Sequence, residues 1–345
     1  MPRFSIPVFE YSSAHRKPGP EIAKKIYFLD DRKLVCGMVR SLLTIHAFRT
    51  SRAYAAAIGL LALEFMIDLS RTPDLILNSR FATDLRDFSV TSRVGELAQA
   101  ISYSYWKWEG GYTCIGDFKS TLAHHHIMPP KNLKTPDYIM LDRKNNILAL
   151  MESKGTLVGK HKKYTQAALK QIQGVCTPVI HPYNSYIKRG WASVVDFNQL
   201  THPATVPAYG PASLYLRDPE VGTECPDSIC HDVFRSSYAS WFDLLGEENI
   251  AKWCRKPLEK SINQNKLKPE AINRSTPLLK RLIAALGFKN GEARFVIDPT
   301  IEKALSSEDA FREIKEYIPK KSNDSDCESP GSAIYFPDGT QIIPA

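Results

Sequence analysis

The chain has 345 residues, of which 43% are hydrophobic and 24% charged, the composition of an ordinary folded protein rather than of a disordered or low-complexity chain. The net charge of +8 is a modest indication of a polyanionic partner such as nucleic acid. The seven cysteines are odd in number and scattered, which argues against a disulfide framework and predicts reduced thiols in a cytoplasmic protein.

The N-terminus and the most apolar segment give no sign of a membrane protein. The N-terminus is polar and interrupted by Pro2 and Pro7, so it lacks the apolar core of a signal peptide. The most apolar segment, 53–69, carries Glu64 and Asp68 and is shorter than a membrane span. We expect a buried helix there and no membrane association.

Helical periodicity dominates the first third of the chain. It covers 36–71 and returns over 91–108, where apolar residues spaced by three and four form one stripe and Gly110 follows its end. Residues 1–90 are therefore predicted to be an N-terminal helical extension, irregular or extended in its first part. A core domain is predicted over 91–220.

Beyond residue 111 the pattern changes to short apolar runs typical of strands. The predicted elements are strands at 112–118, 136–143 and 147–155, a basic amphipathic helix at 161–175, and strands at 190–197 and 213–218. A loop is predicted between the first two of these strands. One helix, three strands, one helix and a strand indicate a mixed α/β domain.

The C-terminal part is predicted to be helical and partly basic over 221–320. Its segment 255–294 contains ten Lys or Arg and three Glu, so it could contact DNA, keep the surface soluble or bind a partner. Residues 321–345 form a polar tail with a short hairpin that turns at Asp338-Gly339.

Two further clusters are weak metal motifs. Cys225, Cys230 and His231 lie close in sequence, but no second cysteine pair accompanies them, so the zinc signal is poor. The run His124-His125-His126 is typical of a loop.

The hairpin of residues 135–156 carries the strongest functional signal. Glu152 and Lys154 are two residues apart on a strand and project from one face, because strand side chains alternate. With a turn near Asn145, the register brings Asp137 opposite position 153, next to both. Two carboxylates and an amine are thus predicted to converge.

Such an arrangement is costly without a cation, since neighbouring carboxylates repel. Mg²⁺ prefers oxygen ligands and is commonly held by one or two carboxylates together with substrate phosphate. Lys154 could orient the attacking water or stabilise charge in the transition state. The set fits phosphodiester hydrolysis better than acyl transfer. A bland alternative is a turn cap at Asp137 and a surface ion pair between Glu152 and Lys154.

The short motifs are common by themselves, and context selects this pair. Pro-Asp occurs four times and an acid–x–Lys triplet five times in the chain. Only 136–154 places both motifs on adjacent predicted strands, between an acid-bearing helix and a basic one.

This pattern resembles the PD-(D/E)xK nuclease superfamily, whose restriction-endonuclease-like core is an αβββαβ unit. Pro136-Asp137 matches its first motif and Glu152-Ser153-Lys154 its second, over about 90–200 of the chain. The resemblance implies that Asp137 and Glu152, with the Ser153 backbone carbonyl, bind Mg²⁺ or the substituting Mn²⁺. It also implies that Lys154 serves the nucleophilic water.

Other site residues are implied more loosely by the same resemblance. Glu96 matches an acid of the preceding helix that many members carry as a metal ligand, although it could equally face solvent. The helix after the second motif often presents a polar residue to the site; among its three glutamines Gln166 is favoured over Gln171 and Gln173. Lysines at its start are candidate phosphate contacts, or else a solvated helix start: Lys160, Lys162 and Lys163.

The resemblance implies a Mg²⁺-dependent DNA endonuclease of a prokaryotic restriction, anti-phage defence or mobile-element system, acting on DNA with a protein partner of such a system. A homo-oligomer is left open. The alternatives are a catalytically silent DNA-binding or assembly subunit that keeps the fold, and an RNase active only within a complex.

Overall fold

The structure of the chain is a computed structural model. It describes residues 3–12, 21–41, 59, 65–84, 87–124, 132–175, 186–187, 189–200, 208–218, 224–245, 247–256, 293–317 and 333–344. Most of the predicted apolar helix, His125 and His126, most of the basic segment and the polar linker before the C-terminal hairpin lie outside these residues.

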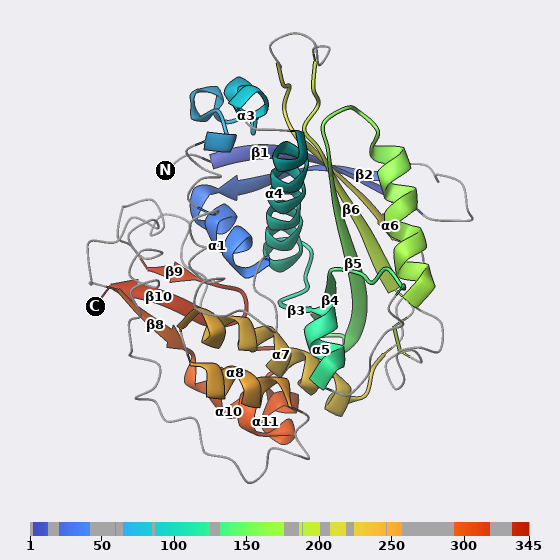
Figure 1. Cartoon of the computed structure of the whole chain (residues 1–345). Helices are drawn as coiled ribbons and strands as arrows, with labels where there is room; N and C mark the ends of the chain where they lie inside the picture. Colours follow the sequence, from blue (N-terminus) through green and yellow to red (C-terminus); the bar gives the residue numbers. More distant parts are fainter. Residues whose placement is uncertain are drawn as a thin grey trace.

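Seven strands form one mixed sheet in the order β2-β1-β7-β6-β5-β4-β3 (Figure 1). The strands are β1 (Arg3–Ser12), β2 (Glu21–Asp30), β3 (Cys114–Asp117), β4 (Tyr138–Asp142), β5 (Ile147–Thr156), β6 (Arg189–Asp196) and β7 (Ser213–Asp218). Strands β3, β4 and β5 form an antiparallel meander, whereas β5 and β6 are parallel. A parallel pair needs a long crossover, and α6 supplies it.

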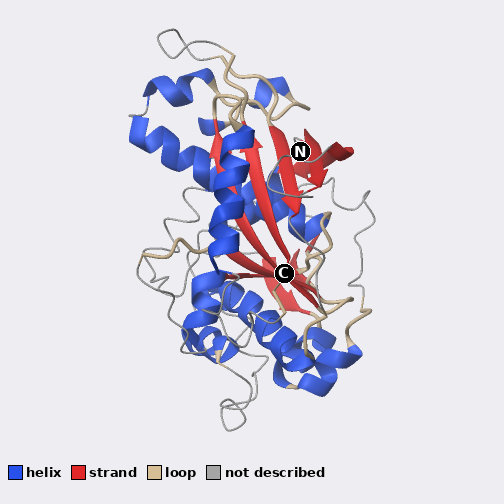
Figure 2. Ribbon diagram, turned by 90° about the vertical axis from the view of Figure 1, so that its right-hand side faces the viewer, coloured by secondary structure: helices blue, strands red, loops and turns tan. Residues whose placement is uncertain are grey.

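Helices cover the sheet and gather at one end of it (Figure 2). The helices are α1 (Asp31–Ser41), η2 (Leu69–Arg71), α3 (Ser79–Asp84), α4 (Asp87–Trp108), α5 (Phe118–His124), α6 (His161–Val175), α7 (Asp227–Leu245), α8 (Glu248–Arg255), α10 (Pro299–Ser306) and α11 (Glu308–Glu313). Among these helices, none is long and apolar enough to cross a membrane.

The predicted core elements α4, β3, β4, β5, α6 and β6 are present in the predicted order, with one additional helix, α5, between β3 and β4. The predicted helix at 161–175 and strand at 213–218 have the bounds of α6 and β7. A mixed α/β fold is therefore what the chain adopts.

The first part of residues 1–90, predicted to be irregular or extended, forms the strands β1 and β2, which join the main sheet instead of standing apart as an extension. Phe4, Ile6 and Val8 are fully buried while the residues between them are only partly buried, and this period of two favours a strand. Helix α1 follows β2 directly and packs on α4.

The loop predicted after the first core strand is also wrong at its start, where α5 forms. Asp117 accepts a hydrogen bond from the backbone N–H of Ser120 at 2.6 Å, which is an N-cap for that helix. The N-cap signal in the sequence is Asp117 three residues before Ser120. It was overlooked because the elements were assigned from the pattern of apolar residues alone.

The two faces of the sheet have separate hydrophobic cores. On the first, here called the α4 face, Met140, Met151 and Val195 pack in one cluster with the apolar stripe of α4. On the second, the α6 face, Ala192 packs on Ala168 and Leu169 of α6. Further along this second face, towards β3, the core continues beneath α7 and the C-terminal elements.

The C-terminal hairpin is confirmed, and it is part of a second sheet. Strands β8 (Ala293–Ile297), β9 (Ile334–Tyr335) and β10 (Thr340–Pro344) are ordered β8-β10-β9, all antiparallel. Gly339 has φ of 84°, the left-handed conformation that glycine adopts most easily in a tight turn.

Candidate active site

The hairpin of β4 and β5 places the predicted acids opposite each other. Tyr138 pairs with Met151, so the register carries Asp137 to the level of Glu152, one position from the predicted 153. Asn146 takes φ of 51° in the turn, a left-handed conformation that asparagine tolerates. The predicted convergence of the two strands at this point is confirmed.

Asp137 is held at the entrance to β4 by contacts from both β5 and α4. Its Oδ2 accepts a hydrogen bond from the backbone N–H of Ser153 at 2.9 Å, and the side chain of Gln99 donates another. Burial raises the pKa of Asp137, while these donors and the Lys154 ammonium oppose the rise. These hydrogen bonds therefore fix the orientation of the Asp137 carboxylate, but they do not fully compensate its negative charge.

Glu152 is a buried carboxylate whose charge is only partly compensated by its neighbours. Its side chain is 0% exposed, its Oε1 is paired with Lys154 Nζ, and among the described residues its Oε2 has no close hydrogen-bond partner. Burial and the charge of the neighbouring Asp137 raise the pKa of Glu152 to about 8, although Lys154 and the backbone N–H of Asp137 oppose the rise. A buried carboxylate oxygen without a partner costs free energy, roughly 1–3 kcal/mol or more.

The donor set at this point fits a hard divalent cation. Two carboxylates lie side by side, and one oxygen of Glu152 lacks a partner. Among the described residues, no three Asp, Glu, His or Cys side chains gather closely enough to hold a metal by themselves. The remaining ligands would therefore be backbone oxygens, water or substrate phosphate, the usual situation for Mg²⁺.

Helix α4 is clamped onto β5 and β6 beside the site. Ser102 Oγ lies 3.1 Å from Ser153 Oγ and 2.8 Å from Ser193 Oγ, a buried hydroxyl cluster. A Cβ added at Gly155 would lie 2.6 Å from the Val94 carbonyl oxygen, so only glycine permits this close approach of helix and strand. The stretch of α4 between these anchors faces the start of β4.

That stretch presents Gln99 to Asp137, whereas Glu96 pairs with Arg93. Burial raises the pKa of Glu96, and Arg93 opposes the rise. The contribution of Glu96 to metal binding therefore stays a prediction. Sequence reasoning missed Gln99, whose signal was its position one turn along the same helix.

The structure treats the three glutamines of α6 differently. Gln166, the favoured candidate, is exposed on the helix. Gln171 instead donates its side-chain amide to the carbonyl of Thr135, two residues before Asp137. Among the three, Gln171 therefore supports the segment that carries the first acid.

Three lysines of the predicted phosphate-contacting group lie where expected, at the start of α6. Lys160, Lys162 and Lys163 are all exposed. They follow β5 by a short loop, so they stand next to the end of the strand that carries Lys154. Their contact with nucleic acid stays a prediction.

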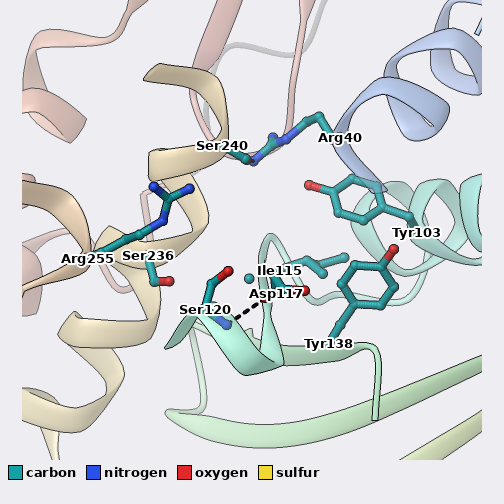
Figure 3. Close-up of a pocket in the computed structure, with 10 residues that line it drawn as sticks. Arg40, Tyr103, Ile115, Asp117, Ser120, Tyr138, Ser236, Ser240 and Arg255 are labelled. Atoms are coloured by element: carbon teal, nitrogen blue, oxygen red, sulfur yellow. Dashed lines mark hydrogen bonds between the residues drawn. The ribbon is translucent and has the colours of Figure 1, made fainter. Parts of the chain in front are cut away.

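Asp117, which was not among the predicted site residues, lies beside the site at the end of β3. The backbone N–H of Phe118 donates to the Asp137 carbonyl at 3.1 Å, and the Asp117 carboxylate contributes to raising the pKa of Asp137. Asp117 also lines a small polar pocket (Figure 3) whose other polar side chains are Arg40, Tyr103, Ser120, Tyr138, Ser236, Ser240 and Arg255.

The weak zinc motif is not assembled. The side chain of His231 contacts the Ala304 carbonyl at 2.6 Å and stacks on Phe311. Cys225 and Cys230 are buried free thiols. His231 is thus engaged in core packing between α7 and the C-terminal helices.

Comparison of the chain with protein-family models, with curated proteins and with solved structures finds no match to any of them.

Proposed function

We propose that the chain is a metal-dependent nuclease that hydrolyses phosphodiester bonds at Asp137, Glu152 and Lys154. The observation that carries this proposal is Glu152, a fully buried carboxylate with an unpartnered oxygen and a raised pKa beside a second buried carboxylate. A purely structural ion pair would be expected to satisfy its buried oxygens, whereas a cation-binding carboxylate keeps one available.

The order of elements supports the same proposal. Apart from α5, which lies between β3 and β4, the run α4, β3, β4, β5, α6, β6 follows the αβββαβ order, and the two motifs stand at the start of its second strand and towards the end of its third. This order of elements supports the resemblance to the PD-(D/E)xK superfamily beyond the short motifs. A similar fold alone does not specify a reaction. The pair of buried carboxylates is the feature that supports phosphodiester hydrolysis.

Each residue has a separate role in the proposed reaction. Asp137 and Glu152 would hold a divalent ion, which supplies charge neutralisation at the phosphate and acidifies water. Lys154, whose side chain is 32% exposed, reaches from the buried Glu152 towards solvent and would orient the attacking water or stabilise negative charge on the phosphate. Ser153 N–H and Gln99 keep Asp137 in place.

DNA is the proposed substrate, in a prokaryotic restriction, anti-phage defence or mobile-element system. The basic net charge of +8 and the exposed lysines at the start of α6 favour a polyanion. The proposed assignment to such systems follows from the resemblance.

The test is incubation of the purified chain with plasmid, linear duplex, single-stranded DNA and RNA, with Mg²⁺, Mn²⁺ or chelator. We expect metal-dependent cleavage that falls about 100- to 1,000-fold in Asp137→Ala and in Lys154→Ala. Matched controls are Asp309→Ala and Lys303→Ala, whose side chains are 86% and 72% exposed and far along the chain from the site.

Cleavage that persists in Asp137→Ala or Lys154→Ala would overturn the proposed site. Cleavage of RNA alone would change the substrate and leave the site intact. If the wild-type chain cut none of the four substrates with either metal, the catalytically silent assembly subunit would replace the nuclease.

A further inference from the structure

On the α6 face of the main sheet, the described part of the chain leaves large apolar side chains of the edge strand β2 exposed. Strands β7, β1 and β2 bury Phe4, Ile6 and Tyr27 on the α4 face. On the opposite face of β2, Ile26 is 59% and Phe28 60% exposed. An apolar strand face left in water is uncommon and marks a binding surface.

This surface is aromatic and carries Lys24 as its cation, while Glu21 contacts Tyr11 at one end of it. We call it the aromatic face, and it consists of Phe9, Tyr11, Lys24, Ile26, Phe28 and Tyr215, which share one side of their strands. The rings of Phe9 and Tyr215 are stacked with centroids 5.1 Å apart, and Tyr215 stacks on His161 of α6 at 3.9 Å. Lys24 Nζ lies 5.3 Å from the centre of the Phe9 ring.

The register of the sheet connects the aromatic face to the catalytic strand. Lys154 pairs with Val194, Val194 with Tyr215, Tyr215 with Phe9, and Phe9 with Lys24. These five residues form one row across five strands, all on the α6 face. Tyr215 stands two strands from Lys154, a separation of roughly 10 Å, about the reach of one or two nucleotides.

Helix α6 begins beside the aromatic face, where His161 stacks on Tyr215 of β7. Its start contributes Lys160, Lys162 and Lys163, all exposed, and His161, which lies on the Tyr215 ring. A nucleic-acid strand that ran from the proposed catalytic residues towards β7 would pass these lysines first and the aromatic rings next.

We propose that the aromatic face binds a single-stranded segment of nucleic acid that flanks the scissile phosphate. Flat rings beside lysines are the combination that binds single strands, because bases stack on the rings while cations contact the backbone. A base-paired duplex would keep its bases away from the rings. A protein partner would need acids to match Lys24 and the α6 lysines, whereas a nucleic acid supplies negative charge along its whole length.

This inference takes its direction from the proposed nuclease function, but its test needs no cleavage. Binding of a fluorescein-labelled 12-nucleotide oligo(dT) would be measured by anisotropy in chelator, beside a 12-base-pair duplex of the same label. We expect Phe28→Ala to weaken oligo(dT) binding roughly ten-fold, the size of one lost stacking contact. Phe28 is exposed, so its removal leaves the core packing untouched. The matched control is Leu69→Ala, 42% exposed on η2.

Lysine variants give a second measurement, the salt dependence of binding, which a loss of packing would not change. Lys24→Ala should lower the slope of log affinity against log salt by about 0.7, the value for one phosphate contact on a single strand. Lys303→Ala on α10 should leave the slope unchanged.

Three results would overturn the inference. The first is oligo(dT) binding unchanged in both Phe28→Ala and Lys24→Ala; the second is a clear preference for the duplex. The third is a concentration-dependent dimer in sedimentation that Phe28→Ala dissociates, which would make the face a contact between two copies. Binding without cleavage would keep this inference and remove the proposed nuclease function, and cleavage without loss in these variants would do the reverse.

Discussion

Two buried carboxylate sites in this molecule are built in opposite ways. Asp338, at the turn of the C-terminal hairpin, accepts from Arg40 at 3.0 Å and from Lys107 at 2.6 Å, and Thr340 donates to its other oxygen. Glu152 has one cation, one unpartnered oxygen and an acid as its neighbour. Both side chains are almost fully buried.

Their pKa values shift in opposite directions for this reason. Burial alone would raise the pKa of Asp338, but Lys107 and Arg40 outweigh it and hold that pKa well below the ordinary range. At Glu152, burial and Asp137 act together and Lys154 does not compensate. The first site is satisfied and holds the hairpin to α1 and α4, whereas the second leaves one carboxylate oxygen without a partner among the described residues, which is what the proposed metal site requires. This difference separates a structural carboxylate from a candidate functional one.

The largest effect on stability is expected at Asp338. Asp338→Asn leaves Arg40 and Lys107 buried without a counter-charge, so the free energy of unfolding should fall by about 3–5 kcal/mol, measured by urea titration. The control is Asp309→Asn, since Asp309 is 86% exposed and its pair with Arg312 should contribute less than about 1 kcal/mol. A loss no larger than that of the control would contradict the description of Asp338 as an anchor.

Glu152→Gln should act in the opposite direction in metal-free buffer. The folded pKa of Glu152 is raised from 4.5 to about 8, so the folded chain holds a proton that the unfolded chain releases in this range. The stabilising contribution is fully present below pH 4.5 and is lost as pH rises to about 8. Glutamine keeps the neutral shape, so at pH 8 the variant should be more stable by roughly 2–3 kcal/mol, with little difference at pH 4.5.

Urea titrations at the two pH values check this, with Glu313→Gln as control because Glu313 is 71% exposed. Parallel pH profiles for wild type and Glu152→Gln would mean that Glu152 is satisfied like Asp338, and the contrast between the two sites would fail. The same variant should lose nuclease activity, since amide oxygen holds a divalent cation poorly compared with carboxylate.

The smallest effect is expected from Gln99, which positions Asp137 without being acidic itself. Gln99→Leu removes a hydrogen-bond donor from the Asp137 carboxylate, whose pKa is already raised, so the ionised form that binds metal is less favoured. The affinity for Mg²⁺, measured by calorimetric titration, should therefore fall about ten-fold. Glu96→Gln is the informative partner variant. If Glu96→Gln weakens Mg²⁺ binding more than Gln99→Leu does, Glu96 is a ligand as its motif position implies.

Much of the core could be predicted from sequence because its signals are local. The stripe of α4, the apolar runs of β4 and β5 and the basic helix α6 each follow from the spacing of apolar residues. A turn at 143–146 then places Asp137 near Glu152 to within one residue. The N-terminal strands were missed because their alternation was read as irregular chain ahead of a helix. In addition, β1 joins the sheet by pairing with β7, some 200 residues away, and no local pattern reveals that pairing.

By itself, the sequence determined the order of the core elements other than α5 and the pairing of Asp137 with Glu152-Ser153-Lys154, because hairpin register and helix periodicity are short-range properties. Only the tertiary structure decided which neighbours those acids have. It placed Gln99 and Asp117 beside Asp137, directed Gln171 to Thr135, satisfied Asp338 with two distant cations and left one oxygen of Glu152 without a partner. Burial and the fields of nearby charges depend on contacts between residues far apart in sequence, and these set which carboxylate is an anchor and which can take a metal.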